Sequence, residues 1–278
     1  MRQLDLFSDD AVRAARAREA LERFDLRAAQ IELDRVAAIY PSDRAVRERL
    51  ARVTRLSTIY EELVGLQGDP LVALLALGAD VDGADRSAWH ARVAREAEMQ
   101  FGLGCMLDGE PVGLHWLLAS KIDEAERSLL ARLEHDPTDA RARGYLADAR
   151  WYKGEADRAR REYLRAFIDD PGAVDTRRIA DSTVADFLVR AESEYETRGD
   201  PCSWVAAVGT VERVFPMPAP TLPGFPGREE SSRAPGLQFY RLISEERAVR
   251  SHNERVAVRR RMKSLCPLLF DAYLRAIY

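Results

Sequence analysis

Side chains capable of chemistry are scattered along this chain rather than grouped in a catalytic pattern. The four histidines stand far apart: His90, His115, His135 and His252. None lies at metal-ligand spacing from another histidine, a cysteine or a carboxylate pair. The glycines of Gly102-Leu103-Gly104 follow an expected helix rather than a strand, so they are not a dinucleotide fingerprint. We therefore expect no catalytic, metal or cofactor site. An enzyme would need a polar cluster assembled from distant segments.

The composition is typical of a helical protein that binds neither nucleic acid nor a membrane. Of 278 residues, 46% are hydrophobic and 32% charged, with a net charge of −4. The cysteines, Cys105, Cys202 and Cys266, are odd in number and form no Cys-x-x-Cys pair, so we expect neither a disulfide framework nor a zinc site. Abundant arginine and alanine with few lysines are typical of a GC-rich bacterial genome.

The chain carries no obvious targeting or membrane segment. Its start contains Asp5, Asp9 and Asp10 and lacks an apolar core, so we do not expect a signal peptide. The longest apolar run, Leu71 to Ala79, is too short to cross a bilayer. These features predict a cytoplasmic protein.

A repeat of helical hairpins organises the middle of the chain. Asp136-Pro137 and Asp170-Pro171 lie 34 residues apart. Between them, Ala140 to Tyr152 predicts one helix, in which Tyr145, Leu146, Ala149 and Tyr152 share a face. Gly154 ends this helix, and Glu155 to Ile168 predicts a second one that Pro171 stops.

This unit, residues 140–173, resembles the tetratricopeptide repeat. Seven residues match the pattern of that family: Leu146, Ala147, Gly154, Ala159, Tyr163, Ala166 and Pro171. Arg143 and Arg150 depart from it, because the family has aromatic residues there. The resemblance implies an all-α fold, a right-handed α-solenoid of helical hairpins, whose usual role is to bind proteins rather than to do chemistry.

Weaker copies end at Pro41, Pro137 and Pro216. The copy ending at Pro41 has Ala17, Ala29 and Leu33 in register, with Phe24 at its turn, and the copy ending at Pro137 keeps Ala125 and Leu129 but has Arg132 in place of a small residue. In the last copy, Trp204 occupies a position that should be small.

We predict four parts of the chain: a flexible segment 1–8, a helical repeat domain 9–215, a Pro/Gly-rich linker or loop 216–236, and C-terminal helices 237–278. Phe225, in the middle of this linker, could be anchored to the body of the protein. Within 237–278 we expect a helix break before Pro267. The apolar end near Phe270 and Tyr273 is expected to cap the solenoid, with a dimer surface as the alternative.

The helices expected before the repeat are bounded by capping residues and glycines. They run from Asp9 or Asp10 to Arg23, from Asp25 to Pro41, from Ser42 to Leu63, from Pro70 to Leu77, from Ser87 to Phe101 and from Pro111 to Ser120.

The resemblance to tetratricopeptide repeats implies a partner-binding face along the first helices of the hairpins. Six residues would form this face: Leu114, Leu118, Arg141, Tyr145, Asp148 and Tyr152. Tyrosine and arginine suit binding hot spots. The alternative is that Tyr145 and Tyr152 only pack hairpins together.

The first residues of the chain resemble a second known pattern. Gln3-Leu4-Asp5-Leu6-Phe7 is similar at all five positions to the motif by which bacterial replication and repair proteins bind the DNA polymerase sliding clamp. Leu6 and Phe7 would be the apolar anchors and Gln3 would supply hydrogen bonds. The alternative is an arm that packs its Leu4, Leu6 and Phe7 onto the first helix pair.

A basic run follows the linker: Arg247, Arg250, Arg255, Arg259, Arg260, Arg261 and Lys263. It could meet phosphates, but Glu245, Glu246 and Glu254 are interleaved with it and no aromatic platform accompanies it. We therefore predict a solvated helix face. The function expected from the whole sequence is a non-enzymatic protein-binding scaffold, with a sliding-clamp-associated protein as the alternative.

Overall fold

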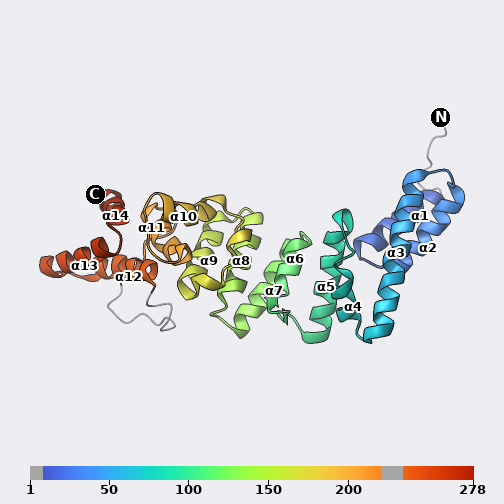
Figure 1. Cartoon of the computed structure of the whole chain (residues 1–278), viewed down its shortest axis with the longest axis horizontal. Helices are drawn as coiled ribbons and strands as arrows, with labels where there is room; N and C mark the ends of the chain where they lie inside the picture. Colours follow the sequence, from blue (N-terminus) through green and yellow to red (C-terminus); the bar gives the residue numbers. More distant parts are fainter. Residues whose placement is uncertain (1–8, 221–233) are drawn as a thin grey trace. The chain divides into compact units, whose positions relative to one another are not determined.

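The computed structural model describes residues 9–220 and 234–278, and within them the fold is all-α (Figure 1). Fourteen α-helices and two short strands are present in these ranges. The chain divides into two compact units, one ending at Glu124 and the other running from Ala125 to Tyr278. This division falls inside the region predicted as one repeat domain, and the C-terminal helices belong to the second unit.

The first unit contains six helices and one β-hairpin. They are α1 (Asp9–Glu22), α2 (Leu26–Ile39), α3 (Arg44–Gln67), α4 (Pro70–Leu77), α5 (Arg86–Phe101), β1 (Met106–Leu107), β2 (Glu110–Pro111) and α6 (Gly113–Leu118). Helix α2 contacts both α1 and α3. As predicted for the copy ending at Pro41, Ala17, Ala29 and Leu33 are buried together, and Phe24 is buried at the turn.

Local signals explain where these helices start and stop. Asp25 accepts a hydrogen bond from the Ala28 amide and begins α2, as predicted. The prediction that Ser42 caps α3 is wrong. The Asp43 side chain caps this helix instead, because it accepts hydrogen bonds from the backbone amides of Ala45 and Val46. Helix α3 runs past the predicted end at Leu63, to Gln67, and stops at Gly68, whose φ of 70° suits glycine.

The helix predicted from Pro111 to Ser120 is shorter, Gly113–Leu118, because Pro111 belongs to a β-hairpin that precedes it. Strands β1 and β2 pair Leu107 with Glu110 in an antiparallel register. Asp108 and Gly109 form the turn, with φ of 50° and 80°. Asp-Gly is the dipeptide that such two-residue turns favour, so the signal was present but too short to read beside the helix pattern.

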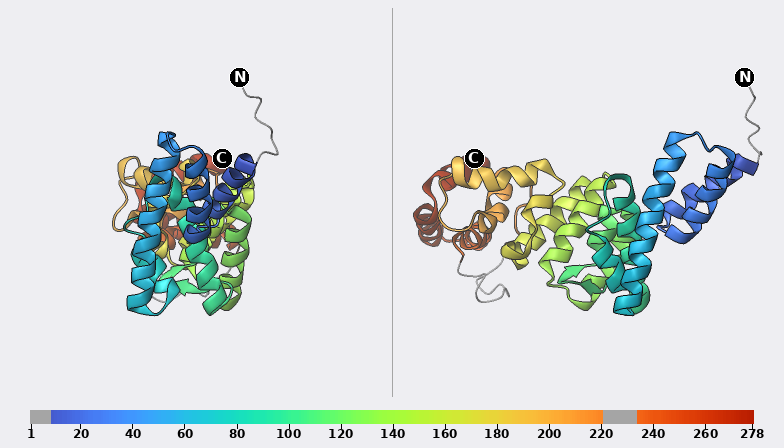
Figure 2. Two further views of the ribbon diagram at one scale, coloured as in Figure 1. Left: turned by 90° about the vertical axis from the view of Figure 1, so that its right-hand side faces the viewer. Right: turned by 45° about the vertical axis from the view of Figure 1, so that its right-hand side comes forward.

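The second unit contains most of α7 (Ile122–His135) and all later helices. These are α8 (Ala140–Tyr152), α9 (Ala156–Asp169), α10 (Ser182–Ser193), α11 (Val205–Val211), α12 (Pro235–Ala248), α13 (His252–Leu265) and α14 (Pro267–Ile277). Figures 1 and 2 show α12 and α14 beside α11, and the three share one core. Helix α12 starts at Pro235, two residues before the predicted start of the C-terminal helices at residue 237. Phe225 lies outside the described residues.

The α8–α9 hairpin follows the predicted pattern closely. Gly154 has a φ of 78° at its turn, and Ala159, Tyr163 and Ala166 are fully buried on α9. Tyr152 is the exception: 62% of its surface is exposed, so it does not share the buried face of α8. The helix break at Cys266 was predicted, whereas the break between α12 and α13 was not.

Arg143 and Arg150, which depart from the predicted repeat pattern, connect α8 to α9 through ion pairs. Both guanidinium groups bind the Glu162 carboxylate of α9, at 2.9 Å for Arg143. Arg150 also lies 3.4 Å from Glu126 of α7. Two long cationic side chains thus connect these helices through one shared, half-buried carboxylate.

Candidate functional site

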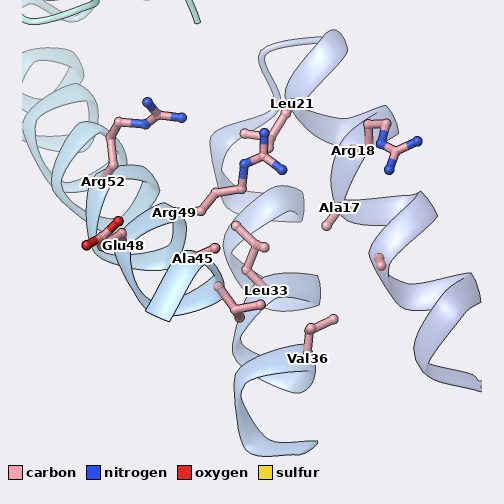
Figure 3. Close-up of a pocket in the computed structure, with 11 residues that line it drawn as sticks. Ala17, Arg18, Leu21, Leu33, Val36, Ala45, Glu48, Arg49 and Arg52 are labelled. Carbon is pink, nitrogen blue, oxygen red and sulfur yellow. The ribbon is translucent and has the colours of Figure 1, made fainter. Parts of the chain in front are cut away.

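An apolar groove with arginines on its rim lies between α1, α2 and α3 in the first unit (Figure 3). Its volume is about 650 Å³, within the range of sites that bind small molecules or peptide side chains. The lining residues come from all three helices: Ala14, Ala17, Arg18, Leu21, Leu33, Val36, Ala45, Val46, Glu48, Arg49 and Arg52.

The two walls use the same helical register. Residues 14, 17, 18 and 21 line the groove from α1, and residues 45, 48, 49 and 52 line it from α3. Both sets follow the i, i+3, i+4, i+7 spacing of one helix face. Ala14 and Ala45 hold equivalent positions, and so do Arg18 and Arg49. The small alanines leave room between the walls.

The floor of the groove belongs to α2. Leu33 and Val36, one helical turn apart, point into the space between the two walls (Figure 3). Both are buried, and Leu33 contacts the small core that Ala29 and Val53 share beneath it. An apolar partner group entering here would meet a closed hydrocarbon surface rather than a wet one.

Two of the four charged lining residues are already paired. Arg52 lies 3.0 Å from the buried Asp85, and Glu48 binds Arg44 at 2.6 Å. Arg18 and Arg49 have no hydrogen-bond or ion-pair partner within residues 9–220 and 234–278. Figure 3 shows Arg49 pointing from α3 toward α1. The groove therefore presents two unpaired positive charges above an apolar floor.

This chemistry is suited to binding rather than to catalysis. The lining contains no histidine, cysteine, serine or tyrosine, and its single carboxylate is held by Arg44. Sequence reasoning missed the groove, because no motif marks it. The available signal was the repeated Ala-x-x-x-Arg at 14–18 and 45–49, which becomes meaningful only when α1 and α3 flank the same helix.

The residues predicted for the solenoid face lie in different environments. Leu114 and Leu118 are half-buried on α6 of the first unit, whereas the other four belong to α8 of the second. The Arg141 guanidinium donates to the Ala173 carbonyl, and Tyr152 is exposed. Asp148 is buried, which corrects its assignment to an accessible face, and Tyr145 is buried as the packing alternative predicts.

Asp148 has a structural role: its carboxylate connects α8, α9 and the loop before α10 by hydrogen bonds. The Tyr163 hydroxyl donates to its carboxylate, and the Ala180 amide donates to it at 2.9 Å. The same amide lies 3.1 Å from the Tyr163 oxygen. Burial raises the pKa of Asp148 to about 7, although both donors favour the ionised form.

A histidine pair that sequence spacing did not reveal lies between α5 and α6. The Nδ1 atoms of His90 and His115 are 3.1 Å apart, and Trp89 contacts both rings. Burial lowers the pKa of His115 to about 4, with Asp108 opposing this in part. No group of three or more metal-ligating side chains occurs in the described part of the chain.

This pair predicts an acid sensitivity of the first unit. The pKa of His115 is lower in the fold than its usual 6.5, so the stability tied to neutral His115 is present above pH 6.5 and lost as pH falls toward 4. We expect His115→Asn to flatten the loss between these pH values by on the order of 2 kcal/mol, measured by urea unfolding. Equal pH profiles in the two proteins would contradict this.

Two predicted features remain: the clamp-like segment and the basic run. The clamp-like segment Gln3 to Phe7 lies outside the described residues. The basic run pairs locally: Arg259 lies 2.7 Å from Glu246, and Arg261 lies 3.1 Å from Glu245. Arg247 donates to the Pro218 carbonyl. Most of the run is exposed, as expected for the predicted solvated helix face, while Arg259 is half-buried.

Comparisons of this chain with protein families, with curated proteins and with solved structures find no match. Within the described residues, no helix is long and apolar enough to span a membrane.

Proposed function

We propose that this chain is a non-enzymatic protein-binding module, and that its partner binds in the groove between α1 and α3. The observation that carries the proposal is the groove itself, with an apolar floor, alanine walls and two unpaired arginines. Arginine is among the residues enriched at protein-binding hot spots. We further propose a right-handed, tetratricopeptide-like solenoid, on the strength of the 140–173 repeat pattern. A bacterial cytoplasm as its location is a proposal that rests on the arginine- and alanine-rich composition and the short apolar runs alone.

Blocking the groove should abolish binding. Ala14 lines the groove and Ala15, its neighbour on α1, does not, while both are exposed. Peptides selected from a random library by the full chain should bind with micromolar dissociation constants. Ala14→Trp should weaken them by at least about tenfold, the equivalent of 1.4 kcal/mol, and Ala15→Trp should leave them unchanged.

The circular dichroism spectra of both variants provide the folding control, because a tryptophan on an exposed helix position should preserve helicity. If the selected peptides bind both variants equally, the groove is not the binding surface and the proposal is wrong.

A second candidate function is association with the DNA polymerase sliding clamp. It rests on the five-residue match Gln3 to Phe7, whose aliphatic and aromatic anchors suit a docking pocket. We expect the full chain to bind its host's sliding clamp, and a Leu6→Ala/Phe7→Ala double variant to lose that binding, both measured by surface plasmon resonance. Absence of binding at tens of micromolar would exclude this function and leave the groove proposal intact.

A further inference from the structure

We propose that the groove receives an acidic amphipathic helix of a partner protein, an inference that rests on the binding function proposed above. The helix would place aliphatic side chains over Leu33 and Val36 and carboxylates toward Arg18 and Arg49. Its chemistry is specified by the charges that the groove leaves unpaired and by the apolar surface between them.

The electrostatic argument concerns what each charged lining residue already binds. Arg52 is paired with Asp85, and Glu48 is paired with Arg44. The opposite charges of each pair largely cancel, so these two pairs contribute little to the electrostatic field in the groove. Arg18 and Arg49 remain, one on each wall and at equivalent positions of the shared register. Each guanidinium offers a fork of donors that fits a carboxylate with two hydrogen bonds. A negatively charged partner would therefore be held from both sides.

The steric argument concerns the shape that the three helices leave. Helix α2 contacts α1 on one side and α3 on the other, and its Leu33–Val36 stripe lies between them. Alanines at positions 14, 17 and 45 keep the walls low. Ridges with i, i+3, i+4 spacing on both walls are the surfaces against which another helix packs.

A polyanion without apolar groups fits this site less well. Phosphate recognition would use the arginines alone, and it would leave the Leu33–Val36 floor without a partner. The floor thus favours a peptide over a nucleic acid.

The test uses the full chain and three labelled 18-residue peptides in fluorescence anisotropy at 0.15 M salt. The first contains Leu, Ala and Glu in an amphipathic helical pattern. The second replaces every Glu with Lys, and the third replaces every Leu with Ala. We expect the first to bind at least about tenfold more tightly than either of the others.

A matched pair of variants locates the charge effect. Arg49 lines the groove and Arg47 does not, yet both are exposed on α3. Arg49→Glu should weaken the acidic peptide by about tenfold or more. Arg47→Glu should change it by no more than about twofold, because solvent and salt screen a charge outside the groove.

Three outcomes would overturn this inference. Equal binding of the Glu and Lys peptides, lost on Ala14→Trp, would show a binding groove without charge preference, so the proposed function would survive alone. Equal binding of the Leu-free peptide would indicate a site that recognises negative charge alone instead. Failure of all peptides to bind at millimolar concentration, together with failure of the library selection, would reject the function itself.

Discussion

Gly236→Ala is expected to destabilise the second unit by about 3 kcal/mol or more, since a methyl group at this position has no space. A Cβ on Gly236 would lie 2.3 Å from the Ser203 carbonyl oxygen and 2.6 Å from the Trp204 Cα. Both are backbone atoms, which cannot rotate away. Trp204 is itself fully buried in the core that α12 covers, so a displaced α12 would also expose that core.

Gly144→Ala is the matched control, because it makes the same change at another buried helix position of the same unit. The nearest atom to its added Cβ, Cγ1 of Val174, lies at 3.5 Å, an ordinary contact. Alanine also favours a helix over glycine by about 1 kcal/mol. Chemical denaturation should show Gly144→Ala unchanged or more stable. An equal loss in both variants would mean that α12 does not approach Ser203 as closely as described.

Tyr163→Phe should cost about 1–3 kcal/mol, because it removes a donor from a buried carboxyl group. Asp148 would keep the Ala180 amide but lose the Tyr163 hydroxyl. The phenyl ring would remain in place, so the change isolates the hydrogen bond from the packing. Tyr152→Phe, on the exposed end of α8, should be neutral in the same urea-unfolding measurement.

The cost of Tyr163→Phe should also depend on pH. Burial places the pKa of Asp148 near 7, above its usual 3.8, so its charged form lowers stability as pH rises through this range. The hydrogen bond from the Tyr163 hydroxyl opposes this rise in the pKa of Asp148. Its removal should therefore matter more at pH 8, where Asp148 is ionised, than at pH 4.5, where it is protonated. A cost that does not change with pH would show that Asp148 does not titrate in this range.

The sequence predicted the helical hairpins well, because their signals are local. Gly154 and Pro171 mark the turn and the end of a helix, and the spacing of Ala159, Tyr163 and Ala166 marks a buried face. The resemblance to a repeat also covered the first hairpin, where Ala17, Ala29 and Leu33 are buried as expected.

The candidate site could not be predicted in the same way, because it depends on contacts between helices. The Ala14–Arg18 and Ala45–Arg49 pairs face each other only because α1 and α3 both contact α2. His90 and His115 meet through a hairpin whose two-residue turn was hidden beside helical patterns. Asp148 shows the opposite error, since a family pattern marked it as a surface residue although it is buried.

The measurement that tests the central claim most directly is the affinity of the Leu/Ala/Glu peptide for the full chain and for its Ala14→Trp and Ala15→Trp variants. Occupation of the groove between α1 and α3 predicts binding to the wild type and to Ala15→Trp, with a loss of at least about tenfold in Ala14→Trp. Undiminished binding to a correctly folded Ala14→Trp protein would contradict the assignment of this groove as the site where a partner binds.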